Sequence, residues 1–368
     1  MKSNIFCIFA IAKKKMALDF IDIDGIRRLD ALLDRCTAVT VTAHTHPDGD
    51  ALGSASAFVC YLRECREKDA VGVICNTPAT TVRPIIPDGL PFLFHDTDPQ
   101  ACLDRIAASD LVILLDGNGF SRTEGLQSAF EASPAPKVLI DHHLNPERER
   151  FEVVFSTPDI SSASELLYYV LLELPDIGGD ARRLPAPAAR ALLTGMTTDT
   201  NNFANSVYPS TLEMSSKLLA AGVDRDGILS NLYQQYSENR IRAFAALLGQ
   251  KMTILPGGVA CMVSDENFQK EFPLAEGETE GLVNIPLGIG RVNMSIFVRW
   301  GGDHFRVSIR SKRGWSANRL ARDYFHGGGH EMAAGGKILL PEDIPSQSGA
   351  SAHVAACVAQ FLQKEDNR

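Results

Sequence analysis

The sequence has no hydrophobic run long enough to cross a bilayer, no C-x-x-C pair, no internal repeat and no excess of positive charge. Its 368 residues carry a formal net charge of −9, which argues against a protein that coats DNA by neutralising phosphates. Its eight cysteines show no disulfide-framework spacing, so we expect reduced, buried thiols. These absences predict a cytoplasmic globular protein that binds neither a membrane nor long duplex nucleic acid.

Residues 1–15 differ from the rest of the chain. An apolar stretch at 5–12 precedes three consecutive lysines at 13–15, which is the reverse of the order in a secretory signal. The stretch is also too short to span a bilayer. We interpret residues 1–15 as a disordered tail or a mis-assigned start, and we place the beginning of the first domain at Met16.

Strand and helix patterns alternate through the first two-thirds of the chain. Apolar, β-branched runs at 38–43, 70–75, 111–115 and 137–140 predict buried strands. Apolar residues at helical spacing predict helices at 51–65, 162–174, 186–196 and 210–221. This alternation is typical of a mostly parallel sheet with helices on both faces. We therefore predict an α/β domain at 16–225, a helical connector at 226–251 and a smaller α/β domain at 252–366.

Acidic and imidazole side chains follow four of these predicted elements. In chain order they are His44, Asp48 and Asp50; Asp116; Asp141, His142 and His143; and Asp199. The carboxyl ends of parallel strands meet at one sheet edge, where ligands bind. Unpaired carboxylates there would repel one another, whereas two divalent cations would resolve the repulsion. Oxygen ligands mixed with imidazole suit Mn, Mg or Fe.

Each cluster taken singly has a simpler explanation. Asp48 could cap the helix that begins near Asp50, and Asp116, followed by glycine, could belong to a turn. Asp199 could equally cap or end a loop, and an Asp-His-His tripeptide could lie on the surface. Because all four clusters occur at element ends with metal-binding side chains, we favour a shared two-metal site that hydrolyses a phosphate ester.

A second region with a chemical signature lies near the C-terminus. Residues 291–322 contain eight basic side chains and one acid, Asp303, although the whole chain is acidic. A glycine-rich segment at 327–336 follows, and glycines let backbone N–H groups approach an anion closely. The region therefore predicts an anion-binding surface, although Arg319 and Arg322, one turn apart on a predicted helix, are better explained as solvated charges.

These motifs together resemble the DHH phosphoesterase superfamily. The resemblance is carried by His44-x-x-x-Asp48-x-Asp50-x-x-Gly53-Ser54, Asp116, Asp141-His142-His143 and Asp199. Similarly, Gly327-Gly328-Gly329-His330 with Ala333-Ala334-Gly335 resembles the signature of the DHHA1 domain. The two-domain size is similar to that of the bifunctional oligoribonuclease and pAp phosphatase (nanoRNase) group.

The resemblance implies a role for each of these residues. One Mn²⁺ would be held by His44, Asp48 and Asp116, and a second by Asp50, Asp116, His142 and Asp199, with Mg²⁺ as a possible substitute. Asp141 would orient an imidazole, and His143 would lie near the scissile phosphate or donate a proton to the leaving oxygen. The terminal phosphate and base of the substrate would be bound by Arg310, Ser311, Gly328, Gly329 and His330.

The implied activity is Mn-dependent hydrolysis of very short single-stranded RNA to 5′-mononucleotides, and of the small adenine nucleotide pAp to AMP. The family also makes a homodimer an expectation. No sequence feature separates this activity from a cyclic-di-AMP or pApA phosphodiesterase. A nucleotide-binding regulator with an inactive metal site predicts the loss of a ligand, and all expected ligands are present. The short chain disfavours a RecJ-like exonuclease, and the Gly-Gly-Gly-His motif disfavours an inorganic pyrophosphatase.

Overall fold

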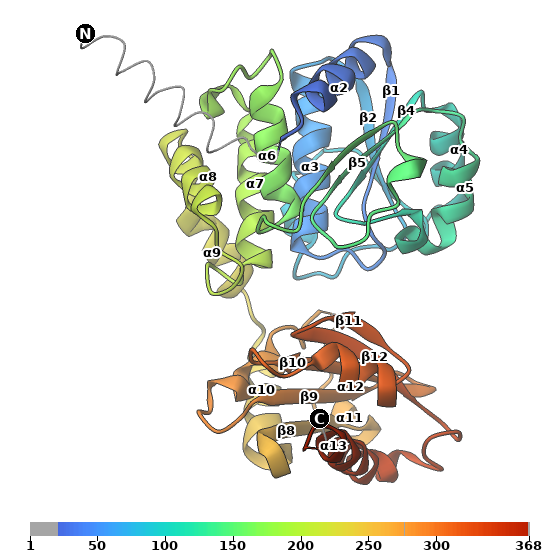
Figure 1. Cartoon of the computed structure of the whole chain (residues 1–368), viewed down its shortest axis with the longest axis vertical. Helices are drawn as coiled ribbons and strands as arrows, with labels where there is room; N and C mark the ends of the chain where they lie inside the picture. The colour runs from blue at the N-terminus through green and yellow to red at the C-terminus, as the bar shows by residue number, and fades with distance from the viewer. Residues whose placement is uncertain (1–20, 276, 367–368) are drawn as a thin grey trace. The chain divides into compact units, whose positions relative to one another are not determined.

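The computed structural model describes residues 21–275 and 277–366. The chain forms two compact units, with unit 1 ending at Gln234 and unit 2 beginning at Gln235 (Figure 1). The predicted tail at 1–15 lies outside the described residues, and the predicted connector at 226–251 spans the boundary between the units. Within the described part of the chain, no helix combines the length and apolar character needed to cross a membrane.

Unit 1 is built on a six-stranded sheet in which every neighbouring pair is parallel. The strand order is β3-β2-β1-β4-β5-β6. Its strands are β1 (Ala38–Thr42), β2 (Asp69–Ile74), β3 (Phe92–Phe94), β4 (Leu111–Leu115), β5 (Lys137–Asp141) and β6 (Val153–Ser156). The chain proceeds outward from β1 in one direction and from β4 in the other. The carboxyl ends of β1 and β4 therefore form a topological switch point, where open α/β sheets bind ligands.

Helices cover both faces of this sheet (Figure 1). One face carries α2 (Ile23–Arg35), α3 (Gly49–Glu64), α6 (Ala163–Glu173) and α7 (Ala186–Asp199), with α8 (Pro209–Ala220) and α9 (Arg225–Tyr233) beyond them. The other face carries α4 (Pro99–Ala108) and α5 (Gln127–Ala132). On β4, Ile113 faces the first layer and Val112 the second, as the two-residue period of a strand requires. The predicted α/β class with helices on both faces is confirmed.

Small residues let α3 and α7 pack closely against each other. A Cβ at Gly53 would lie 2.7 Å from the Ala191 carbonyl oxygen, and one at Gly49 would lie 2.3 Å from Thr198 Oγ1. The earlier residue of α3 contacts the later residue of α7, so the two helices are antiparallel and the N-terminus of α3 lies beside the C-terminus of α7. Both ends lie at the carboxyl edge of the sheet.

Unit 2 contains a second six-stranded sheet, in which only β8 and β9 pair in parallel. Its order is β11-β12-β10-β9-β8-β7. Its strands are β7 (Thr253–Leu255), β8 (Val259–Ser264), β9 (Met294–Trp300), β10 (His304–Ser311), β11 (Gly328–His330) and β12 (Ala333–Leu339). One apolar core includes α12 (Ala317–Tyr324) and α13 (Ala350–Asp366), and another includes α10 (Glu238–Ala246) and α11 (Glu266–Glu271).

Short helical turns connect these elements. They are η1 (Arg83–Ile85), η2 (Phe120–Leu126), η3 (Arg148–Arg150), η4 (Ala181–Arg183), η5 (Leu247–Lys251), η6 (Pro256–Gly258), η7 (Leu282–Gly288) and η8 (Gln347–Gly349). The cysteines within the described range are free thiols, and all of them except Cys65 are buried, as the sequence predicts.

Candidate metal centre

The side chains predicted to bind metal gather at the carboxyl edge of the unit 1 sheet. Three groups have ligand atoms that lie within 4.8 Å of one another: His44, Asp48 and Asp116; Asp50, His142 and Asp199; and Asp116, His142 and His143. The first group is one predicted ligand set, and the second contains the other set apart from its bridging residue. Asp116 belongs to the first and the last of these groups. The last group shares His142 with the group of Asp50 and Asp199, so Asp116 lies between the two predicted ligand sets, as a bridging carboxylate must.

Asp116 is the central residue of this cluster. It follows β4 with a φ of 50°, a left-handed conformation that aspartate tolerates better than most residues, and its side chain is buried. Its Oδ2 lies 3.4 Å from His44 Nε2, and its Oδ1 lies 3.3 Å from His142 Nε2. Among the described atoms, Oδ1 has no hydrogen-bond partner. A buried carboxylate oxygen without a hydrogen bond, facing imidazole nitrogens, fits a shared cation.

A backbone contact orients the His44 ring toward the carboxylates of the cluster. Its Nδ1 lies 2.7 Å from the Thr45 carbonyl oxygen, so Nδ1–H donates there and Nε2 faces the two carboxylates. Burial by itself lowers the pKa of His44, but hydrogen bonds to Asp116 and Asp48 outweigh it and raise the pKa well above the usual value. Without metal, the ring therefore carries a proton where a ligand would carry a lone pair.

Asp48 performs the capping role that was the simpler explanation for it. It is the N-cap of α3, and its Oδ1 accepts from the backbone N–H groups of Asp50 at 3.0 Å and Ala51 at 3.1 Å. The same Oδ1 lies 3.8 Å from His44 Nε2. The two explanations are therefore compatible, because one carboxylate can cap a helix and belong to a metal-capable group.

Asp50 is held by a helix far away in the sequence. Its Oδ2 accepts from the Ala163 N–H at 2.6 Å and its Oδ1 from the Ser164 N–H at 2.9 Å. These donors belong to the first turn of α6, whose positive end stabilises a carboxylate. Burial and the charges of Asp116 and Asp199 nevertheless raise the pKa of Asp50 well above its usual value. A cation would relieve that repulsion.

The contribution of α6 to this site is not predicted by the sequence. The N-cap Ser162 accepts from the Glu165 N–H at 3.0 Å, and a capping serine before an apolar run is a sequence signal for a helix start. That signal locates the helix. It does not reveal that the first N–H groups of the helix reach a carboxylate more than 100 positions earlier.

His142 and Asp199 complete the second group. His142 Nε2 lies 3.6 Å from Asp199 Oδ2, at the last residue of α7. Burial lowers the pKa of His142, but the nearby carboxylate of Asp116 outweighs this and raises the pKa to about 10. Burial also raises the pKa of Asp199, to about 7. Without a metal ion, the raised pKa values of the His142 imidazole and the Asp199 carboxyl both favour bound protons at this place.

Asp141 orients the other histidine of the tripeptide. It ends β5 fully buried, and it accepts from the backbone N–H of His143 at 3.1 Å and from its Nδ1 at 2.7 Å. The imidazole that Asp141 orients is therefore His143. His46, which sequence analysis leaves out of the ligand sets, belongs to none of the metal-capable groups among the described residues.

The predicted substrate-binding residues lie on two strands of unit 2. Arg310 on β10 and His330 on β11 both pair with Ala333 of β12, so their Cα atoms share one row of the sheet. Arg310 is half-buried, and burial lowers its pKa. Its Nη1 donates to the Ile309 carbonyl, and no acidic side chain in the described chain pairs with it. A half-buried cation without an acid favours an anionic ligand.

The remaining substrate-binding predictions concern a hydroxyl and two glycines. Ser311 is buried, and its Oγ donates to the Trp315 carbonyl at 2.5 Å, so the hydroxyl also stabilises the turn after β10. Gly329 has a φ of 144°, and a Cβ there would lie 2.6 Å from the Ala333 carbonyl oxygen. Gly328 and Gly329 are exposed. The side chain of His330 is outside what the structure describes.

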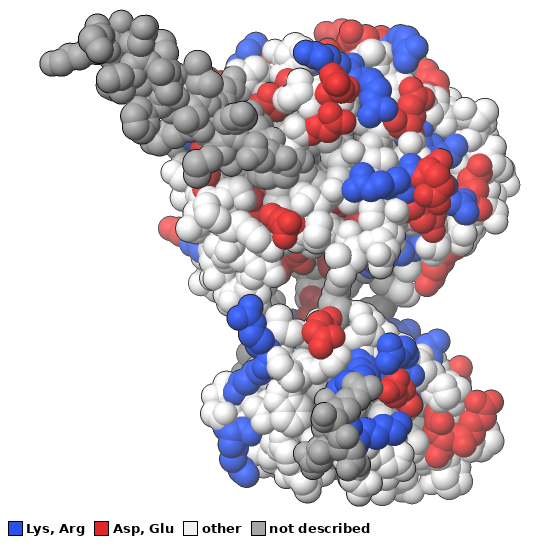
Figure 2. Space-filling view, viewed as in Figure 1, with Lys and Arg blue, Asp and Glu red and all other residues white. Residues whose placement is uncertain are grey.

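Charged side chains of both signs occur on the surface of unit 1 (Figure 2). On the face of unit 1 seen in Figure 2, acidic and basic side chains are interspersed. That face has no continuous basic band of the kind that tracks a nucleic-acid backbone.

Comparison with known proteins places these features in a family. Residues 38–196 match the model of the DHH family N-terminal domain, and residues 269–350 match the DHHA1 domain. The probable bifunctional oligoribonuclease and PAP phosphatase NrnA of Streptococcus mutans is 27% identical over 305 residues, covering 80% of this chain and 88% of that protein. The cyclic-di-AMP phosphodiesterase PdeA of Listeria monocytogenes is 25% identical over 65% of this chain and 36% of its own.

A solved structure extends the similarity to the fold. The crystal structure of an exopolyphosphatase-related protein from Bacteroides fragilis superposes with a TM-score of 0.85 and 29% sequence identity, covering 92% of this chain and 96% of that one. The DHH match contains every candidate metal ligand except Asp199. The chain belongs to the DHH family of phosphoesterases, with a DHHA1 domain after its DHH domain.

Proposed function

We propose that this protein is a two-metal phosphodiesterase that hydrolyses very short single-stranded RNA to 5′-mononucleotides and pAp to AMP. The observation that carries the proposal is Asp116, a buried carboxylate whose two oxygens face the imidazoles of two different metal-capable groups. The similarity to an oligoribonuclease and PAP phosphatase over most of both chains supports the substrate class.

The metal ligands divide into two sets around Asp116. His44 and Asp48 would complete one set, and Asp50, His142 and Asp199 the other. Two bound divalent cations, Mn²⁺ or Mg²⁺, would lower the pKa of water and neutralise charge on the phosphoryl oxygens. The α6 N-terminus holds Asp50 in place, and the Thr45 carbonyl selects the His44 tautomer.

Asp141 and His143 would handle the proton of the reaction. Asp141 accepts hydrogen bonds from the backbone N–H and from the ring Nδ1 of His143, which fix the position of the imidazole. His143 would then donate a proton to the oxygen that leaves phosphorus. Arg310 would bind a phosphate of the substrate, because a guanidinium grips phosphate with two parallel hydrogen bonds.

The test is a panel of substrates assayed for turnover with and without Mn²⁺. The panel contains pAp, pApA, cyclic-di-AMP, a dinucleotide and a pentanucleotide of RNA, and a much longer RNA. We expect the dinucleotide, the pentanucleotide and pAp to be hydrolysed fastest. Preference for cyclic-di-AMP or pApA would favour the activity named for the Listeria relative, and cleavage of only the long RNA would contradict the proposal. Nucleotide binding without turnover would indicate an inactive regulator.

Replacing Arg310 with glutamine should raise KM for the dinucleotide and change kcat less. Loss of one charge-assisted hydrogen bond costs about 1.5–3 kcal/mol, or roughly 10–100-fold in affinity. The matched control is Arg313→Gln, because Arg313 is exposed on the turn that follows β10 and should leave both constants unchanged. Equal effects of the two substitutions on KM would argue against a phosphate contact at Arg310.

A further inference from the structure

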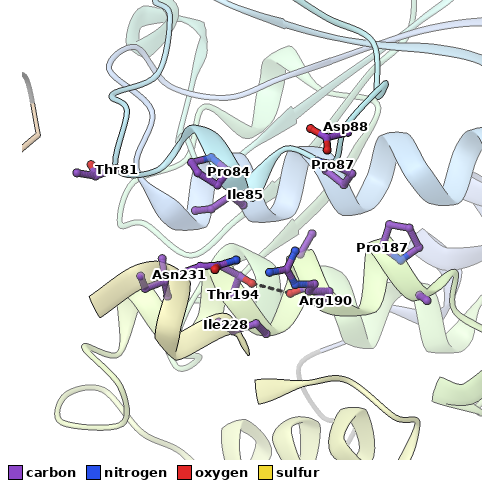
Figure 3. A pocket seen from close by; sticks show the side chains of 13 residues that line it. Thr81, Pro84, Ile85, Pro87, Asp88, Pro187, Arg190, Thr194, Ile228 and Asn231 are labelled. Carbon is purple, nitrogen blue, oxygen red and sulfur yellow. Dashed lines mark hydrogen bonds between the residues drawn. The ribbon is translucent and has the colours of Figure 1, made fainter. Parts of the chain in front are cut away.

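A pocket of about 360 Å³ opens on the surface of unit 1, apart from the metal centre. One wall is the segment around η1, with Pro84, Ile85 and Pro87, and the other is formed by α7 and α9 (Figure 3). None of the metal-capable residues lines it. Its volume is at the lower end of the range for small-molecule sites in proteins. The pocket thus has room for one small ligand and no role in the proposed hydrolysis.

The walls of the pocket are mostly apolar and rigid. Pro84 and Pro87 fix the backbone of the η1 segment, and Ile85 packs in a buried cluster with residues of α3. On the opposite wall, Ile228 of α9 is buried in the core of the main helical layer. Because both walls are anchored to cores of unit 1, the pocket is formed before any ligand binds, which lowers the entropic cost of binding.

A few polar groups converge in this apolar setting. Figure 3 shows Arg190, Thr194 and Asn231 side by side on the α7–α9 wall, facing Pro84 and Ile85 across the pocket. Within the described structure, the Arg190 guanidinium and the Asn231 amide make no hydrogen bond or ion pair. Thr81 Oγ1, which belongs to a lining residue, is buried without a hydrogen-bond partner. Apolar walls with a few convergent polar groups are the composition of a ligand site.

The charge of the pocket selects the class of ligand. Among the described residues, Arg190 is the only basic one that lines it, and Asp88 on the opposite wall forms no ion pair with Arg190. One cation matches a single negative charge better than a polyphosphate does. No aromatic side chain from the described part of the chain lines the pocket, so these walls offer no platform on which a nucleotide base could stack.

We propose that this pocket binds a small organic acid with one carboxylate and an aliphatic body. The carboxylate pairs with the Arg190 guanidinium and accepts from the Asn231 amide. The aliphatic body lies against Pro84, Ile85 and Ile228. A bound acid bridges α7, which ends at Asp199, and α9, in which Arg225 donates to Asn202 just after Asp199.

The experiment compares octanoate with octanamide, which has the same chain without the charge. Binding to the full-length protein is measured by calorimetry in the presence of EDTA, so the result does not depend on metal or on turnover. We expect octanoate to bind at least about tenfold more tightly than octanamide, as one charge-assisted hydrogen bond provides. Equal binding of the two ligands, or no binding of octanoate, would overturn the proposal.

Two variants locate the site. Arg190→Gln should remove the preference for octanoate and leave the fold intact, because the side chain is exposed. Asp88→Asn is the matched control on the opposite wall, and it should leave octanoate binding unchanged or slightly tighter. If Asp88→Asn weakened binding as much as Arg190→Gln, the ligand would not be anchored as an anion at Arg190. Loss of hydrolysis with retained octanoate binding would contradict only the proposed phosphodiesterase function.

Discussion

Asp116→Asn is expected to abolish Mn-dependent hydrolysis, lowering kcat for a dinucleotide by roughly 10³-fold or more. The amide keeps the volume of the side chain but removes its charge, and it turns an N–H₂ group toward one of the two imidazoles that face Asp116. Asparagine can therefore not bridge two cations. Mn²⁺ binding followed by electron paramagnetic resonance should show the loss of at least one of two sites.

The fold should tolerate this substitution. Asp116 is crowded by other carboxylates, and its charge raises the pKa of both Asp50 and Asp199. Removing that charge relieves this repulsion, but it also removes the ion pairs with His44 and His142 that, against the effect of burial, hold the pKa of Asp116 well below its usual value. We therefore expect a lower unfolding temperature but an unchanged circular dichroism spectrum at the assay temperature. Hydrolysis that survives in a folded Asp116→Asn protein would exclude the two-metal mechanism.

Asp110→Asn is the matched control for Asp116→Asn. Asp110 immediately precedes β4, and its carboxylate accepts from the N–H groups of Thr37 at 2.8 Å and Ala38 at 3.0 Å. Asp110 precedes β4 and Asp116 follows it, so the two carboxylates lie at opposite ends of this strand. Losing part of this pairing should lower stability by about 1 kcal/mol and leave both Mn²⁺ sites and kcat unchanged.

The fold of unit 1 could be predicted because its central strands are buried on both faces. Such strands are continuous apolar runs, as β4 shows with five buried residues in succession. β12 of unit 2 was missed because Gly335 and Gly336 disfavour a strand in isolation. Tertiary packing requires the second of them, since a Cβ at Gly336 would lie 2.3 Å from the Phe325 carbonyl oxygen. The strand depends on a contact that its own sequence does not show.

In the candidate site, too, some features could be predicted from local sequence and others depend on tertiary contacts. The ligand residues follow strand ends in short motifs, so local sequence is enough to propose them. Their supports are set by the arrangement of helices in space. Examples are the α6 N–H groups on Asp50 and the choice of His143 by Asp141, which depends on the turn after β5. Sequence spacing alone does not determine which imidazole a buried carboxylate reaches.

Gly195→Ala is expected to show how strongly the metal centre depends on helix packing. A Cβ at Gly195 would lie 2.1 Å from Ser164 Oγ and 3.0 Å from Asp50 Oδ1. The backbones of α3 and α7 are also in close contact here, since a Cβ at Gly53 would lie 2.8 Å from Gly195 Cα. The methyl group must therefore displace Ser164, in the first turn of α6, and crowd the Asp50 carboxylate. We expect a loss of about 1–3 kcal/mol in the free energy of unfolding by urea.

The displacement should also weaken Mn²⁺ binding, because Ser164 donates one of the two hydrogen bonds that hold Asp50. Loss of such support reduces metal affinity by roughly 10–100-fold. Gly249→Ala is the matched control: nothing lies within 4 Å of its added Cβ, so it should leave Mn²⁺ binding and stability unchanged or slightly improved. Wild-type Mn²⁺ affinity in the Gly195→Ala protein would show that α6 does not position Asp50.

A double substitution separates the local clash from a general weakening of α7. Ser164→Ala removes the oxygen nearest to the new methyl group and keeps the backbone N–H that donates to Asp50. If the clash with Ser164 Oγ is the main cause, the Gly195→Ala, Ser164→Ala protein should regain part of both the stability and the Mn²⁺ affinity. The residue pair would then show a coupling energy of about 0.5–3 kcal/mol in a double-mutant cycle. Strictly additive effects would instead assign the loss to the close contact between α3 and α7 at Gly53, and the metal centre would depend on that helix pair more than on α6.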